Sequence, residues 1–219
     1  MIYLLGGPPR VGKSIISNQI RQKHALSVVS TDTLAALLQH VQSPEAVPDL
    51  FVFETFNKMP NAQRVQFITN EPADLIEFVR RESLVVWKAV DAYIRREYDE
   101  GRDVLVEGVA VLPELVGQLD DIPHRAVFIG NQAKNHQENI KKSAEEHPHD
   151  WMREASDSYI HAFAMFVNRM SASIEQEAKQ VGFEYIEVDH LSIRDVAENV
   201  MKSLGLSVSV PQLSSPNRR

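Results

Sequence analysis

The segment Leu4–Ser14, LLGGPPRVGKS, constrains the fold more than any other part of the chain, because it holds three of the nine glycines. The apolar run Ile2–Leu5 leads into it, and the helix-like segment SIISNQIRQKH follows it. Gly7–Ser14 matches the pattern G-x-x-x-x-G-K-[ST] at every fixed position, in the strand–loop–helix context that this pattern requires. Glycines let backbone N–H groups approach phosphate oxygens, and the start of the following helix adds unpaired N–H groups and a partial positive charge. The segment therefore predicts a phosphate-binding loop, or P-loop.

The residues of this loop have separate expected roles. Lys13 is expected to reach the β- and γ-phosphates of a nucleotide, and the hydroxyl of Ser14 to bind Mg²⁺. Pro8 and Pro9 lack an N–H but lie in the variable part of the loop, which they stiffen. The predicted nucleotide-binding residues are Gly7, Pro8, Pro9, Arg10, Val11, Gly12, Lys13 and Ser14.

Hydrophobic patterns along the rest of the chain alternate between strands and helices. Four more apolar runs are typical of buried strands, and helical patterns lie between and after them. This alternation predicts an α/β fold, in which a five-stranded parallel sheet carries helices on both faces, as in P-loop NTPases. The four runs are residues 25–29, 103–109, 124–130 and 183–189.

Residues 1–205 are predicted to form one domain. Within it, the mixed and proline-containing residues 43–80 predict a helical insertion. Apolar residues at spacings of three and four predict one helix over 82–98 and another from Met152 to Ile174. The polar segment 131–153 precedes most of the second helix, and we expect it to form a mobile lid. Residues 206–219 are expected to be a disordered tail.

Composition excludes several classes of function. The chain has no cysteine, so a disulfide, a thiolate metal site and a cysteine nucleophile are impossible, and a cytoplasmic location is expected. A net charge of −7 argues against binding to nucleic acid, whose backbone attracts basic faces. No run of apolar residues is long enough to span a membrane, so no membrane association is expected.

Two acidic residues follow or end predicted strands, at the edge of the sheet where such folds bind ligands. Asp32 follows the second strand, and its carboxylate could orient and deprotonate a hydroxyl that attacks the γ-phosphate. The alternative is a helix cap, although Ser30 or Thr31 could fill that role instead. Glu107 ends the third strand and could hold Mg²⁺ directly or through water. Its alternatives are an ion pair or a contact to the phosphoryl acceptor.

Several basic residues are candidates for contacts to anions. Arg153 could close over the phosphates with the lid and stabilise charge in the transition state, and Lys141 and Lys142 are weaker candidates. Arg80 and Arg81, at the base of the insertion, could bind an anionic acceptor. All five could equally be solvated surface charges. The segment HPHDW (147–151) lacks zinc-type spacing and predicts no metal site.

Four segments give the chain a family resemblance over residues 1–200. GGPPRVGKS, STDTL, GRDVLVEGVAVLP and YIEVD occur in the order of the nucleoside- and nucleotide-kinase branch of P-loop proteins. EG followed by LP looks most like 2-phosphoglycerate kinase-type proteins, and chloramphenicol phosphotransferase is more distantly similar. The resemblance implies ATP and Mg²⁺, Asp32 as the base toward the acceptor, and a lid between the last two strands. Ala110 stands where the glycerate kinases would have histidine, so their acceptor is not carried over.

The leading hypothesis is an ATP-dependent kinase that moves the γ-phosphate of ATP to a hydroxyl of a small metabolite, with Lys13, Asp32 and Arg153 as catalytic residues. Residues 43–80 would then line the acceptor. One alternative is an ATP-binding regulatory or toxin–antitoxin module without turnover. Another is an NTPase, or a transferase of another group, with the same fold. Asp32 favours the kinase, because a pure binding module needs no carboxylate beside the γ-phosphate.

Overall fold

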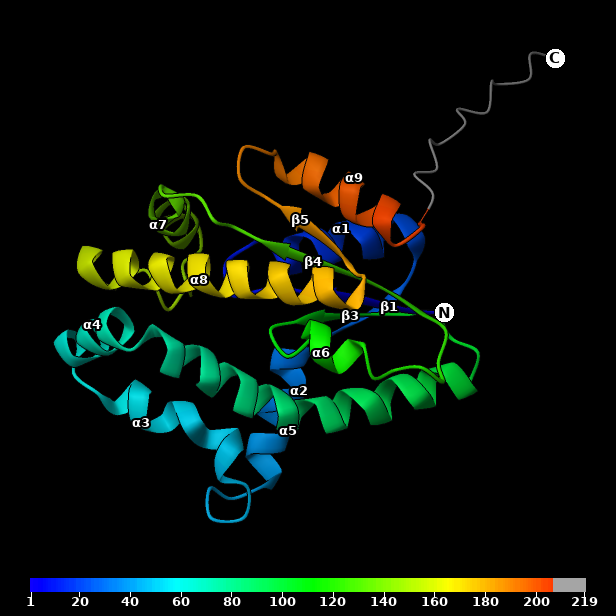
Figure 1. The fold of residues 1–219 in the computed structure, drawn as a ribbon, viewed down its shortest axis with the longest axis horizontal. Helices are drawn as coiled ribbons and strands as arrows, with labels where there is room; N and C mark the ends of the chain where they lie inside the picture. Colours follow the sequence, from blue (N-terminus) through cyan, green and yellow to red (C-terminus); the bar gives the residue numbers. More distant parts are fainter. Residues whose placement is uncertain (207–219) are drawn as a thin grey trace.

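Five strands form one parallel sheet in the computed structural model, which describes residues 1–206 (Figure 1). The predicted tail lies outside the described residues, except for Leu206. The strand order is β2-β3-β1-β4-β5, and every neighbouring pair is parallel, which confirms the predicted fold class. The strands are β1 (Ile2–Gly6), β2 (Ser27–Ser30), β3 (Val104–Gly108), β4 (His124–Gly130) and β5 (Glu184–Glu187).

The strand register brings the predicted site residues to one edge of the sheet. All residues of β1 and β3 are buried, as expected of central strands that are covered on both faces. Leu5 of β1 and Ser30 of β2 both pair with Glu107 of β3. Because parallel strands end at the same edge, the P-loop after β1, the corner after β2 and the end of β3 lie next to one another.

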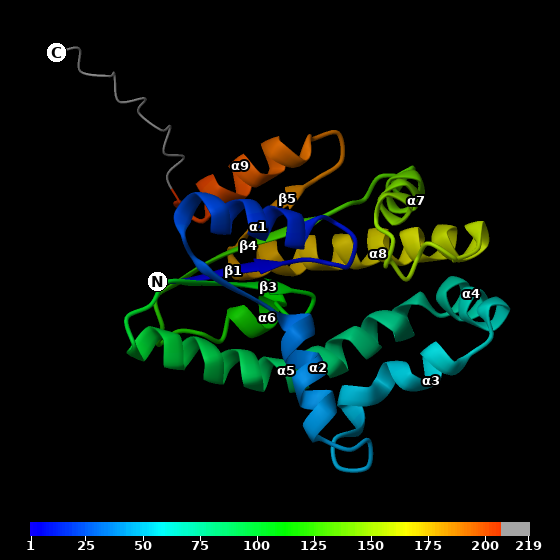
Figure 2. The same ribbon diagram turned by 180° about the vertical axis from the view of Figure 1, so that it is seen from behind.

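Helices cover both faces of the sheet (Figures 1 and 2). α1 (Lys13–His24) and α9 (Ile193–Ser203) pack side by side on one face. On the other face, α5 (Pro72–Asp99) packs on β3, and α8 (Asp157–Val181) packs on β4 and β5, with α6 (Pro113–Val116) against α8. No helix among the described residues is both long and apolar enough to cross a membrane.

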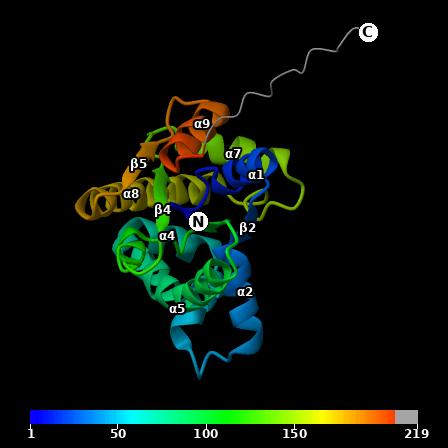
Figure 3. The same cartoon turned by 90° about the vertical axis from the view of Figure 1, so that its right-hand side faces the viewer.

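A helical arm extends from the second face of the sheet (Figure 3). It comprises α2 (Thr31–Val41), η1 (Pro48–Phe51), α3 (Val52–Lys58), α4 (Asn61–Asn70) and the first half of α5. Four phenylalanine rings pack against one another within it, those of Phe53, Phe56, Phe67 and Phe78. Residue 80, the predicted end of the insertion, lies inside α5. The helix begins at Pro72 rather than residue 82, because proline suits the first turn and buried residues such as Leu75 and Val79 continue its apolar face.

The predicted lid contains α7 (His136–Glu146), and turns and irregular backbone follow this helix up to residue 156. The predicted start of the next helix at Met152 is wrong, since α8 begins at Asp157. Ser156 sets this start, because its hydroxyl accepts a hydrogen bond from the N–H of Tyr159 at 3.2 Å and caps the helix. Met152 is buried although it lies in a turn. Its apolar side chain fits the spacing of the buried residues of α8, but Met152 is not part of this helix.

Candidate active site

The P-loop turns sharply between β1 and α1. Gly12 precedes the helix with φ of +92°, in the left-handed region that favours glycine. Because no side chain caps α1, the first N–H groups of this helix remain available to a ligand. Arg10 also has a positive φ, +66°, which is uncommon for a residue with a side chain. The loop therefore has the open helix start that a phosphate chain needs.

Lys13 is buried beneath the loop, with 7% of its surface exposed. Its Nζ donates hydrogen bonds to the carbonyl oxygens of Gly7 at 2.9 Å and Pro8 at 2.6 Å. Burial lowers the pKa of Lys13 to about 8, against the opposing effect of the nearby carboxylates of Glu107 and Asp32. The ammonium group is thus held in the loop at neutral pH, within reach of a phosphate bound there.

Ser14 and Glu107 meet at the start of α1. The Ser14 hydroxyl donates a hydrogen bond to Oε1 of Glu107 at 3.1 Å. Glu107 is only 4% exposed, and burial raises its pKa, whereas Lys13 and the hydrogen bond from Ser14 lower it. A hydroxyl and a carboxylate are hard oxygen donors of the kind that Mg²⁺ uses together with substrate phosphates and water. The two predicted metal ligands therefore fit this ion.

Asp32 is the second residue of α2, and it does not cap this helix. Ser30 is the cap, because its hydroxyl accepts a hydrogen bond from the N–H of Asp32 at 3.3 Å. The Asp32 carboxylate is consequently not needed for capping, and it lines the same cavity as Lys13. The structure thus assigns the cap to Ser30, one of the two residues that the sequence offered for it.

The close packing of Thr31 explains why glycine follows Glu107 at position 108. A Cβ on Gly108 would lie 1.8 Å from Oγ1 of Thr31, the first residue of α2. Only glycine therefore allows the start of α2 to pack this closely on the end of β3. The sequence singled out the EG pair as a family feature, and the structure shows that it brings Asp32 and Glu107 to one place.

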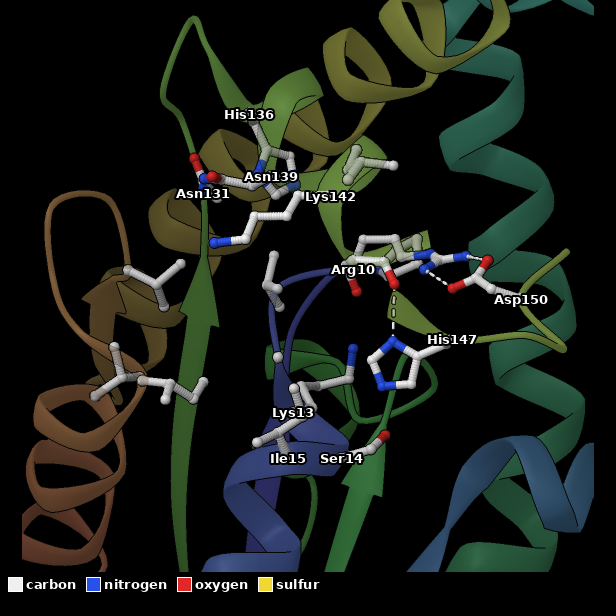
Figure 4. Close-up of a pocket in the computed structure, with 18 of the residues that line it drawn as sticks. Arg10, Lys13, Ser14, Ile15, Asn131, His136, Asn139, Lys142, His147 and Asp150 are labelled. Atoms are coloured by element: carbon white, nitrogen blue, oxygen red, sulfur yellow. Dashed lines mark hydrogen bonds and ion pairs between the residues drawn. The ribbon is translucent and has the colours of Figure 1, made fainter. Parts of the chain in front are cut away.

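A cavity of about 760 Å³ opens above the P-loop (Figure 4). This volume is typical of small-molecule sites. One wall is apolar and well exposed, formed by Ile15 of α1 with Leu191 and Ile193 at the start of α9, whose exposed fractions are 49%, 39% and 42%. The opposite wall comes from the end of β4 and from α7, where Asn131, His136, Asn139 and Lys142 face the cavity.

His136 is a further residue of this cavity that the sequence did not indicate. It is 2% exposed, and neither ring nitrogen has a hydrogen-bond partner. Burial lowers the pKa of His136 to about 4, partly offset by Asp189, so the imidazole is neutral at pH 7. A neutral imidazole offers one donor and one acceptor to a polar ligand.

Four of the five predicted basic residues are not among the residues that line this cavity, namely Arg153, Arg80, Arg81 and Lys141. Arg153 is exposed and is not among the residues that line it. Arg80 is bound to Glu114 of α6 and Glu177 of α8, and Arg81 is bound to Asp49 of the arm. By these ion pairs, Arg80 links α5 to α6 and α8, and Arg81 links α5 to η1.

Of the two candidate lysines in the predicted lid, Lys141 and Lys142, only Lys142 lines the cavity. Lys141 instead pairs with Asp157 at the start of α8. Two other residues of the predicted lid, Asp150 and Trp151, contact Arg10 of the P-loop. Both belong to the segment HPHDW (147–151), for which the sequence predicted no metal site and indicated no other role.

The parallel sheet and the loop at Gly7–Ser14 give the chain a P-loop fold, and the chain is similar in sequence to kinases of this fold. No family model matches it. It is similar to the 2-phosphoglycerate kinase of Pyrococcus horikoshii, with 29% identity over 117 residues, which cover 53% of this chain and 37% of that protein. The 2-phosphoglycerate kinase of Methanothermobacter thermautotrophicus is 25% identical over 208 residues, 93% of this chain and 65% of that protein. The chain thus spans less than two thirds of either relative.

Among solved structures, the chain is similar to shikimate kinase from Acinetobacter baumannii in complex with shikimate. The TM-score is 0.46 and the identity 15%, with 95% of this chain and 94% of the other covered.

Proposed function

We propose that the protein is an ATP-dependent kinase that transfers the γ-phosphoryl group of ATP to a hydroxyl of a small molecule. The observation that carries this proposal is the position of Asp32, which lines the same cavity as Lys13 and Ser14 while Ser30 caps the helix. A phosphate-binding loop alone would suit a binding module or an NTPase. A carboxylate that no structural role requires, beside that loop, favours transfer to a hydroxyl.

ATP would lie along the cavity, with its phosphates in the P-loop and its base at the apolar wall. The Nζ group of Lys13 would give up its hydrogen bonds to the carbonyl oxygens of Gly7 and Pro8 and donate to phosphate oxygens instead. The exposed side chains of Ile15, Leu191 and Ile193 offer the apolar surface that a purine ring would cover. Ser14 and Glu107 would hold Mg²⁺, directly or through water, and the ion would neutralise charge on the β- and γ-phosphates.

The reaction would proceed by in-line displacement at the γ-phosphorus. The acceptor oxygen forms a bond to this phosphorus while the bond to the β–γ bridging oxygen breaks, and that electron pair remains on ADP. Asp32 orients the acceptor hydroxyl and takes its proton. Lys13 stabilises the charge on the transferring group. Arg153 would join this site only if the segment 147–156 moved, because its side chain is exposed outside the cavity lining.

The acceptor is proposed only as a small hydroxylated molecule. The names of the relatives make 2-phosphoglycerate the first compound to test. Arg80 and Arg81 would bind an anionic acceptor only by giving up the carboxylates of the chain that already pair with them. We place the reaction in the cytoplasm, in keeping with the absence of cysteine.

Asp32→Asn tests the proposal with one variant. Asparagine keeps the size of the side chain and caps helices about as well as aspartate, but it cannot take the proton. We expect turnover to fall by about 10²–10⁴-fold, with ATP affinity and melting temperature nearly unchanged. Turnover is measured as ADP release from Mg-ATP over a panel of acceptors, and affinity by calorimetry.

Two results would refute parts of this proposal. Turnover of Asp32→Asn within about threefold of the wild type, far less than a general base contributes, would remove Asp32 from the mechanism. Binding of neither ATP nor GTP by the wild type in the presence of Mg²⁺ would refute the kinase altogether.

A further inference from the structure

Arg10 is the only arginine among the described residues that lines the cavity. It belongs to the P-loop, between Pro9 and Val11, and its side chain is only 15% exposed. Figure 4 shows its guanidinium pointing toward Asp150. Arg10 thus lines the same cavity as Lys13 and Ser14, whereas Arg153 does not.

The lid holds this guanidinium by two kinds of contact. Nη1 and Nη2 of Arg10 donate to the two carboxylate oxygens of Asp150, and its Cζ lies 5.3 Å from the ring centre of Trp151. The hydrogen bonds from Arg10 are the main reason that the pKa of Asp150 lies below its usual value. Asp150 also accepts the N–H of Met152 at 2.8 Å, so the turn is built around this carboxylate. One ion pair thus joins the P-loop to the lid.

A phosphate can compete with Asp150 for the same guanidinium. The planar fork of arginine binds carboxylate and phosphate with similar bidentate geometry. ATP brings several negative charges to the loop that carries Arg10. If a phosphate replaced Asp150, the P-loop would lose its ion pair with the turn at 147–153, and this turn would be free to move.

We propose that Arg10 binds the transferring phosphoryl group, and that Asp150 holds Arg10 back until the nucleotide arrives. Arg10 would then stabilise charge in the transition state, the role that the sequence assigned to Arg153. Release of Asp150 would couple nucleotide binding to movement of the lid. This inference rests on the proposed kinase function.

The first test compares arginine variants by ADP release from Mg-ATP, with 2-phosphoglycerate, the other acceptors of the panel, and water alone. We expect Arg10→Gln to lower kcat by about 10³-fold, the lower end of the range for a catalytic arginine. Arg10→Lys should recover only part of this loss, because lysine keeps the charge but not the fork. Arg169→Gln, an exposed position on α8, is the matched control and should retain wild-type activity.

The outcome for Arg153 decides between the two arginines. A large loss of kcat in Arg153→Gln, together with activity of Arg10→Gln within about threefold of the wild type, would overturn the proposal, because such a loss is far below that of a catalytic arginine. Wild-type protein that binds no Mg-ATP would refute the kinase function, and this inference with it. If the wild type binds and turns over Mg-ATP and the Arg10 variants are as active as the wild type, only this inference is refuted.

The second test asks whether Asp150 competes with the nucleotide. Asp150→Asn keeps the size of the side chain but removes its charge. We expect this variant to bind a non-hydrolysable ATP analogue several-fold more tightly than the wild type, and to show no such gain in the Arg10→Gln background. If the ion pair persisted in the nucleotide complex, Asp150→Asn would not tighten binding, and the proposed exchange would be wrong.

Trp151 provides a direct signal for the movement of Arg10. The chain has two tryptophans, and Trp87 is buried in α5 whereas Trp151 is exposed under the guanidinium. We expect the ATP analogue to change the tryptophan fluorescence of the wild type but not of Trp151→Phe. In Arg10→Gln the change should be largely lost although calorimetry still detects binding. An equal fluorescence change in Arg10→Gln would overturn the proposal.

Discussion

Glu82 is an acidic residue whose burial should make the stability of the protein depend on pH. It lies on α5, half-buried against α2, where its Oε1 accepts a hydrogen bond from Nε2 of Gln39 at 3.3 Å. Burial, and to a lesser degree the charge of Asp32, raises the pKa of Glu82 to about 7. Glu82→Gln should keep the hydrogen bond from Gln39 and remove the ionisation.

The sign and size of the effect follow from proton linkage. Because the pKa in the folded state is raised above the ordinary value of 4.5, the folded protein binds more protons than the unfolded chain between pH 4.5 and about 7. The associated stability is fully present below pH 4.5 and is lost as the pH rises through 7. A shift from 4.5 to about 7 corresponds to about 3 kcal/mol at 1.36 kcal/mol per unit. Partial exposure of Glu82 reduces this to about 2–3 kcal/mol.

The assay is chemical denaturation at pH 4.5, 6, 7 and 8.5 for the wild type and Glu82→Gln. We expect the two proteins to have similar free energies of unfolding at pH 4.5, and the variant to be more stable by about 2–3 kcal/mol at pH 8.5. Glu77→Gln, at an exposed position of the same helix, is the control and should show no such trend. A stability difference that is the same at pH 4.5 and pH 8.5 would refute the assignment of a raised pKa to Glu82.

Two further predictions concern basic residues. Nucleotide affinity should fall as the pH rises past 8, by up to about tenfold per unit, because free protein with neutral Lys13 must take up a proton to bind phosphate. Calorimetry from pH 7 to 9.5 measures this fall, and Lys13→Met, which should lack turnover, should also lack the trend. Arg80→Met should lower stability by about 1–2 kcal/mol, because Glu177 and Glu114 lose their partner, while KM for the acceptor stays unchanged. A raised KM with unchanged stability would instead place Arg80 in an acceptor site.

The sequence was sufficient for the sheet and the P-loop because both depend on local patterns. Buried parallel strands are short apolar runs, and β4 coincides with the predicted run at 124–130. The position of Asp32 followed from topology, since residues just after parallel strands collect at one edge. That Ser30 caps α2 required the structure, because three neighbouring side chains could each have done so.

The contacts of Arg10 could not be predicted in the same way. Arg10 and Asp150 are 140 positions apart, and the turn that presents Asp150 has no regular pattern. The helical arm was obscured for a related reason. Its short helices are stabilised by phenylalanines that pack across segments, so no single segment shows a complete apolar stripe. Charge partners and packing between distant segments are properties of the tertiary fold.

The partners of the phosphate-directed groups suggest how nucleotide binding would be coupled across the site. Lys13 is hydrogen-bonded to loop carbonyls, Ser14 to Glu107, and Arg10 to Asp150. Each group thus has a partner within the chain, so none is a buried, unsatisfied polar group, which would destabilise the fold. Phosphate oxygens or Mg²⁺ could replace each partner, so binding would exchange one favourable contact for another. Because the three exchanges involve the P-loop, β3 and the lid, a single ligand would act on all three elements, and variants at the three positions should show non-additive effects on nucleotide affinity.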